Sequence, residues 1–253
     1  MRALAFMLIL LTTAPAFARP LRARFEPTDL ELEKPGVLDV DLQVGYLYGA
    51  QSRLMLPDFE VDLGITRLFE IDLDGAYAID PRTAGGDSVP DNLWLAAKLG
   101  LFSLHWEHFM FSGGVQLGPR FPVAHGAVGV GFNGLALIGL AFNRTHLVIN
   151  LGAYYDPAQP TMDPSKTARP IGVQLGLAAD VDITRDGRFG FHGEIGATVG
   201  VAVDPSQIVL AAGLVFSPNE NLDLSILALV GLLPGADRAG GMAGVSPKLV
   251  LWH

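Results

Sequence analysis

The sequence contains no cysteine, few charged residues and no apolar run long enough to form a membrane-spanning helix. Without cysteine no disulfide framework can stabilise the chain, and we expect no lipoprotein anchor. Charged residues make up only 17% of the chain and include four lysines, and the formal net charge of −9 argues against nucleic acid as a partner. Yet 50% of the residues are hydrophobic and the mean hydropathy is +0.36. That combination is too apolar for an ordinary secreted soluble protein.

The first 18 residues have the pattern of a secretory signal peptide. Arg2 supplies a positive start, residues 3–11 (ALAFMLILL) form a short apolar stretch, and residues 16–18 (AFA) match a cleavage site. The alternative is a buried N-terminal helix. We expect cleavage after Ala18, a charged periplasmic lead-in over residues 19–35, and a folded unit over residues 36–253.

An exported apolar chain without spanning helices predicts a closed barrel of strands, the other structure that satisfies every backbone hydrogen bond inside a bilayer. The longest apolar runs, 134–142 and 224–233, are far shorter than the 18 or more residues that a membrane helix needs. Residues 37–48 (VLDVDLQVGYLY) instead alternate between apolar and polar positions, and such alternation is typical of a strand.

About twelve alternating segments follow one another, each close to the ten residues that a tilted spanning strand requires. They are 37–48, near 58–65, near 69–79, 92–103, 107–118, about 128–142, 146–155, 170–183, 188–201, 207–217, 221–232 and near 241–252. Tight turns at one end and mostly longer links at the other are typical of outer-membrane barrels. The predicted fold class is all-β, a transmembrane antiparallel up-and-down β-barrel of 12 strands, with 10–14 left open. The segment at 128–142 is apolar on both faces, so its register stays open.

Aromatic residues gather at the ends of these segments on the apolar face. Such girdles are expected where rings meet the two membrane interfaces. Tyr46, Tyr48, Tyr77 and Tyr155 fall at the outer ends, and Phe69, Phe109, Phe111, Phe142, Phe189, Phe191 and Phe216 fall at the periplasmic ends. A soluble barrel or sandwich would also alternate, but its outer face would then be the polar one.

Acidic residues occupy the alternate positions, and we expect them to line a hydrated lumen because charge on the lipid face is costly. The predicted lumen-lining residues are Asp39, Asp41, Glu60, Asp62, Glu70, Asp72, Asp74, Lys98, Asp180, Asp182, His192, Glu194 and Asp223. Rings of carboxylates favour cations, so the hypothesis is an acidic aqueous path. The alternative is structural, with the acids paired to Lys98 or to arginines such as Arg67 and Arg188.

Catalytic and metal-binding patterns are weak in this sequence. Residues 105–108 (HWEH) do not match the zinc-binding pattern H-E-x-x-H and lie at a predicted turn. His192 and Glu194 lie two residues apart, so they share a face and could act as an acid–base pair, although a polar lumen pair is the simpler interpretation. Because no nucleophile motif or phosphate-binding loop occurs, we expect no enzyme, cofactor or metal.

Four stretches resemble a family of bacterial outer-membrane barrels named for a meta-pathway of phenol degradation and regarded as transport channels. They are 63–77 (LGITRLFEIDLDGAY), 91–102 (DNLWLAAKLGLF), 146–155 (HLVINLGAYY) and 220–235 (ENLDLSILALVGLLPG). The resemblance implies an outer-membrane location and passage of small, even apolar, molecules, and it supplies no site residues. The C-terminus departs from the usual final aromatic, since Trp252 precedes His253, and Pro247 interrupts the last segment.

The sequence therefore predicts a passive outer-membrane channel for small solutes with a cation-favouring lumen. The alternative is a closed structural or surface-binding barrel without an open pore. The expected partners are outer-membrane lipid, the barrel-assembly machinery and a small molecule or ion that permeates.

Overall fold

The computed structural model describes residues 32–49, 52–79, 88–90, 93–123, 129–155, 157, 171–200, 207–233 and 236–252. The predicted signal peptide, its cleavage point at Ala18 and most of the predicted lead-in lie outside these residues. Within the described part of the chain, no helix is long and apolar enough to cross a membrane.

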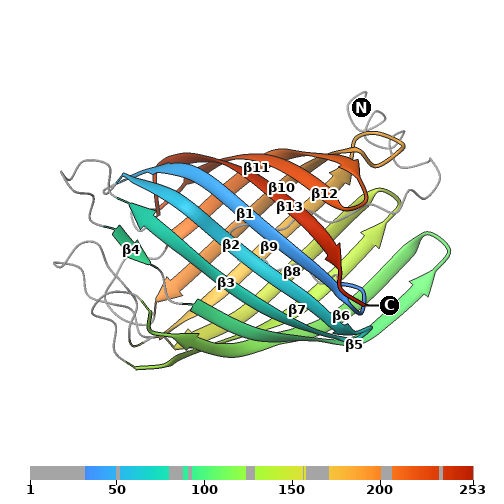
Figure 1. The fold of residues 1–253 in the computed structure, drawn as a ribbon, viewed down its shortest axis with the longest axis horizontal. Helices are drawn as coiled ribbons and strands as arrows, with labels where there is room; N and C mark the ends of the chain where they lie inside the picture. Colours follow the sequence, from blue (N-terminus) through green and yellow to red (C-terminus); the bar gives the residue numbers. More distant parts are fainter. Residues whose placement is uncertain are drawn as a thin grey trace, which may run out of the picture.

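The chain forms a closed antiparallel barrel of twelve long strands, with one short strand outside the ring (Figure 1). The long strands are β1 Val37–Tyr48, β2 Arg53–Thr66, β3 Phe69–Ile79, β5 Leu93–Trp106, β6 Phe109–Phe121, β7 Gly131–Phe142, β8 Thr145–Tyr155, β9 Ile171–Asp182, β10 Phe189–Gly200, β11 Gln207–Asn219, β12 Leu222–Gly231 and β13 Ala239–Val250. Consecutive strands pair, and β1 closes the ring against β13. The three-residue β4 (Ser88–Pro90) pairs only with β3. The predicted 12-stranded barrel is confirmed.

The two ends of the barrel differ in their connections. At one end, which we call the turn end, turns of a few residues join β2 to β3, β5 to β6, β7 to β8, β9 to β10 and β11 to β12. Two of these turns contain left-handed residues, Asn143 (φ 53°) and Gly187 (φ 68°), which such tight reversals favour. The other end, where most links are longer, we call the loop end. β1 begins and β13 ends at the turn end (Figure 1).

The strands alternate as predicted, with apolar side chains on the outer surface. Leu42 on β1 pairs with Phe59 on β2 and Val245 on β13, so rows of apolar residues run around the barrel. Ile226 is 62% exposed at the middle of β12, and Leu214 beside it on β11 is 51% exposed. Exposed aromatic residues lie towards both ends, among them Tyr48 and Tyr155 at the loop end. This outer surface suits lipid, which confirms the transmembrane fold class.

Several strand boundaries differ from the sequence prediction. β2 begins at Arg53 rather than near residue 58, because a register shift between Met55 and Asp58 carries the strand past Pro57. β5 runs to Trp106 rather than residue 103, so the β5–β6 hairpin extends further at the turn end. β13 ends at Val250, which leaves Trp252 beyond the strand.

Pro247 does not prevent closure of the barrel. It pairs with Leu222 on β12, while on the β1 side the ladder contains the pairs Asp39–Lys248 and Leu42–Val245 and skips the two positions between them. Since proline has no N–H to donate, a local gap of this kind is the expected cost. The register is the same on both sides of the gap, and the sheet closes around it.

Candidate functional site

The inner faces of β1, β2 and β3 carry a group of carboxylates that we call the acidic wall. It consists of Asp39, Asp41, Glu60, Asp62, Glu70, Asp72 and Asp74. These residues alternate with the outward apolar ones, as the strand period of two requires. Five of them are at most 4% exposed, and Glu60 and Asp74 are partly exposed. The acidic wall lies towards the turn end, because β1 and β3 begin and β2 ends there.

Two lysines bind the acidic wall from the adjoining strands. Lys98 on β5 lies 2.8 Å from Glu70 Oε1, and both side chains are almost fully buried. Lys248 on β13 lies 2.9 Å from Asp39 Oδ2 and also contacts Glu33. These contacts place each ammonium between strands, where it offsets the repulsion among neighbouring carboxylates.

Uncharged donors complete part of the acidic wall. Gln116 Nε2 on β6 donates to Asp72 at 2.7 Å, and Gln43 Nε2 donates to Asp41 at 2.7 Å. Ser246 Oγ on β13 donates to the other oxygen of Asp41 at 3.0 Å. These donors satisfy carboxylate oxygens that burial removes from water.

Asp62, Glu70 and Asp72 each offer a carboxylate oxygen, and these oxygens lie within 4.8 Å of one another. Oxygen donors in such a group suit a hard cation such as Ca²⁺ or Mg²⁺. Lys98 already supplies a positive charge at 2.8 Å from Glu70, so the ion pair accounts for this grouping without a metal.

A second buried polar group lies across β9 and β10. His192 Nδ1 lies 2.7 Å from Asp180 Oδ1, and its Nε2 lies 3.0 Å from Glu194 Oε2. Since a carboxylate occupies each ring nitrogen, neither nitrogen remains to take a proton from a nucleophile. The arrangement is therefore a polar network rather than a catalytic pair. We call these three residues the histidine network.

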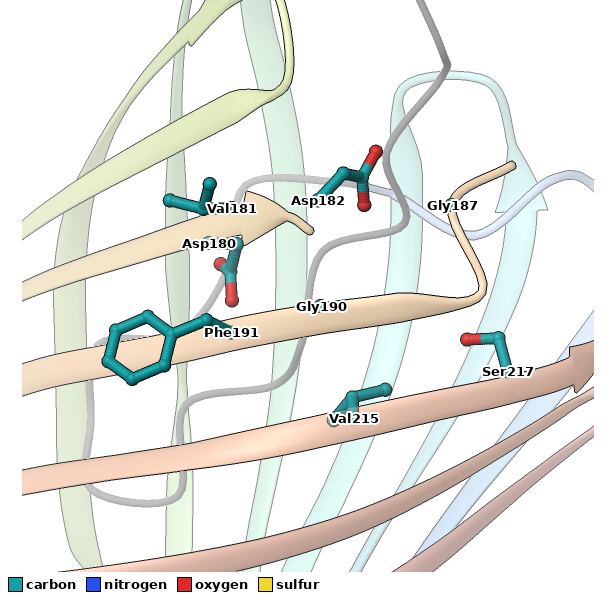
Figure 2. Close-up of a pocket in the computed structure, with 8 residues that line it drawn as sticks. All are labelled: Asp180, Val181, Asp182, Gly187, Gly190, Phe191, Val215 and Ser217. Atoms are coloured by element: carbon teal, nitrogen blue, oxygen red, sulfur yellow. The ribbon is translucent and has the colours of Figure 1, made fainter. Parts of the chain in front are cut away.

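A small cavity lies beside the histidine network, next to the turn between β9 and β10. Figure 2 shows Asp180 and Asp182 on β9, with Val215 and Ser217 on β11, around it. Its volume is about 10 Å³, which is close to the space that a single water molecule needs. The cavity is too small for an organic ligand.

Apolar side chains fill part of the interior away from the charged groups. Leu47, Val209, Ala211 and Leu229 form one buried cluster towards the loop end, with Met55 packed against it. Trp94, Ala96, Leu135 and Leu137 form another on β5 and β7. The second cluster explains why the segment at 128–142 is apolar on both faces: one face packs inside the barrel and the other meets lipid.

The structure brings the predicted lumen residues into two groups. The acidic wall with Lys98 forms one, and Asp180, Asp182, His192 and Glu194 form the other. Asp223 on β12 lies apart from both and accepts a hydrogen bond from Ser217 Oγ. All of them face inward, although most are buried rather than open to solvent.

Sequence reasoning missed two kinds of interior residue. Glu33 lies before the first strand, where no alternation reveals its direction. Asn133 is fully buried on the inner face of β7, in the segment whose register was open. Asn133 pairs with Tyr154 on β8, and this pairing shows that the Asn133 side chain faces inward. The sequence alone does not reveal which residues of β7 and β8 pair.

No protein-family model and no curated protein matches the sequence. Solved structures do match: the KdgM porin is similar at 10% sequence identity and a TM-score of 0.53, over 83% of this chain and 98% of the porin. The chain shares the barrel fold of porins. A KdgM porin in complex with disordered oligogalacturonate is also similar, at 10% identity and a TM-score of 0.51, over 83% of this chain and 98% of that one. The resemblance to the phenol-pathway barrels is not confirmed and stays a prediction.

Proposed function

We propose that this barrel lies in a bacterial outer membrane and conducts small solutes, with a preference for cations. The turn end then faces the periplasm, since short turns lie on that side in outer-membrane barrels. The observation that carries the proposal is the acidic wall, which holds seven inward carboxylates; Lys98 pairs with Glu70, and Lys248 pairs with Asp39. The excess of negative charge raises the local concentration of cations and lowers that of anions.

The negative charge of the acidic wall also bears on which class of solute could pass. One KdgM porin structure contains oligogalacturonate, an acidic oligosaccharide. An acidic wall repels a polyanion of that kind, so this barrel is better suited to cations or to uncharged solutes. Outer-membrane lipid and the barrel-assembly machinery are the partners that such a barrel requires.

The proposal is tested by the conductance of the refolded protein in planar bilayers under a salt gradient. We expect a reversal potential that reports cation preference, and a smaller preference in the double variant Asp41→Asn/Asp72→Asn. Asp186→Asn is the matched control, because Asp186 is also acidic but lies exposed in the β9–β10 turn, where it should leave the reversal potential unchanged. Anion preference, or a double variant identical to the parent, would contradict the role of the acidic wall.

A closed structural barrel is the second candidate, and a specific observation favours it. The interior holds two apolar clusters, and Asp62, Glu70 and His192 are fully buried. Packing of this kind leaves less room for water than a wide porin lumen. Absence of conductance from a protein that has folded, as judged by heat-modifiable mobility on a gel, would support this candidate over the channel.

A further inference from the structure

The segment just before β1 lies inside the barrel. Residues 32–35, which we call the strap, run along the inner faces of β5, β3 and β2 at the turn end. Leu32 approaches Gly100 on β5, where an added Cβ would lie 3.1 Å from the Leu32 side chain. The backbone oxygens of Glu33 and Lys34 lie over Gly64 on β2, only 2.4 and 2.3 Å from the position of a Cβ there. The strap backbone can approach β2 because Gly64 lacks a side chain, whereas at Gly100 only the flexible end of the Leu32 side chain lies near β5.

Charged groups hold the strap in place. The Glu33 backbone N–H donates to the Glu70 carboxylate, and the Glu33 carboxylate pairs with Lys248. Lys248 in turn lies 2.9 Å from Asp39, and Glu70 lies 2.8 Å from Lys98. We call Glu33, Lys248 and Asp39 the clasp. It connects the strap to β13 and β1, the two strands that close the ring.

A sharp turn returns the chain from the strap to the wall. Val37 N–H donates to Lys34 O at 2.9 Å, and Gly36 adopts a left-handed conformation with φ 81°. Gly36 N–H donates to Gly64 O at 2.8 Å, and Leu251 N–H donates to Gly36 O at 2.7 Å. Backbone hydrogen bonds therefore hold the strap at its C-terminal end, and the clasp holds it at Glu33.

We infer that the strap narrows the turn-end mouth of the barrel and that the clasp sets how readily solutes pass there. This inference rests on the proposed channel function. A chain segment across the inner wall occupies space that a permeating solute would use, and the Glu33 carboxylate adds a charge at the mouth. On this inference Glu33 and Lys248 influence conductance, although neither belongs to the acidic wall.

Two variants free the strap by different means. Gly64→Ala introduces a methyl group against the strap backbone without changing any charge, and Glu33→Gln weakens the clasp without changing any volume. Gly134→Ala is the matched control, because a Cβ on Gly134 meets no neighbouring atom closer than 3.9 Å. If Gly64→Ala fails to fold, Glu33→Gln tests the same inference.

The position of the strap is measured separately from conductance. The chain has no cysteine, so Leu32→Cys/Gly100→Cys creates a single pair for oxidative cross-linking. We expect efficient cross-linking in this background and with Gly134→Ala, and a severalfold loss of cross-linking with Gly64→Ala or Glu33→Gln. We expect single-channel conductance to rise severalfold in the same two variants, and the minority of Glu33→Gln channels that do cross-link to conduct less than those that do not.

The measurements separate a failure of the strap inference from a failure of the proposed channel. If the strap variants lose cross-linking while conductance stays at the parent value, and Asp41→Asn/Asp72→Asn still alters selectivity, the strap inference is overturned and the channel stands. If no cross-link forms in the parent background, the strap does not lie on β5 and the inference fails. If every variant folds and none conducts, both proposals are overturned.

Discussion

At the scale of single residues, several carboxylates buried in the interior are bound by a cation or by hydrogen-bond donors. Lys98 and Glu70 illustrate this, since both side chains are at most 2% exposed and their charged atoms lie 2.8 Å apart. A buried ion pair contributes little net stability compared with an apolar pair, but loss of one partner leaves an uncompensated charge. The pair is thus a point at which a single substitution has a large effect.

We predict that Lys98→Met destabilises the barrel by about 3–5 kcal/mol, because it leaves Glu70 buried without its cation. The double variant Lys98→Met/Glu70→Gln should recover much of that loss. Equilibrium urea unfolding in lipid vesicles measures both. Arg188→Met is the control: Arg188 and Asp186 are 61% exposed and 3.6 Å apart, so loss of Arg188 should barely change the free energy of unfolding. Equal effects at the two sites would contradict the buried pairing.

Single residues were predictable from the sequence where the alternation was strong. Asp39, Asp41, Glu70 and Asp72 face inward as expected, because a period of two fixes the direction of each side chain once one face is assigned to lipid. Leu135 and Leu137 were not predictable, since an apolar interior and a lipid surface select the same residue types. Their partners Trp94 and Ala96 lie on β5, which is distant in sequence.

At the scale of strands, the barrel closes despite local irregularities in the pairing of its strands. The shift at Met55–Asp58 in β2 and the ladder gap beside Pro247 in β13 both leave the flanking pairs intact. Both occur in strands adjacent to β1. Such irregularities could not be placed from the sequence, because they depend on which strand lies opposite.

A charge on the outer face of a strand should cost most at its middle. Ile226 lies at the middle of β12 and is 62% exposed, whereas Leu251 lies just beyond β13 at the turn end and is 53% exposed. We predict that Ile226→Arg reduces the free energy of unfolding in lipid vesicles by about 2–4 kcal/mol, and Leu251→Arg by about 0–1 kcal/mol. Similar small losses at both positions would mean that β12 does not cross the hydrocarbon.

At the scale of the whole molecule, the interior changes from mainly charged to more apolar along the barrel axis. The acidic wall, the histidine network and the strap lie towards the turn end, while Leu47, Val209 and Leu229 pack together towards the loop end. If the barrel conducts, a solute would therefore pass a buried apolar cluster towards the loop end and the acidic wall at the turn end. Alternation in the sequence predicts which side chains of a strand face inward. It does not predict that charged groups gather at one end of the barrel and apolar groups at the other, because this depends on how the strands are aligned.

The proposed channel depends on apolar side chains that face lipid and carboxylates that face the interior. Single cysteines at residues 38–44 on β1, each carrying a spin label in lipid vesicles, test it most directly through collisions with oxygen, which partitions into lipid. We predict high oxygen accessibility at Leu38, Val40, Leu42 and Val44, and low accessibility at Asp39, Asp41 and Gln43. The opposite phase, or uniform accessibility along the strand, would mean that β1 does not turn its apolar face to lipid.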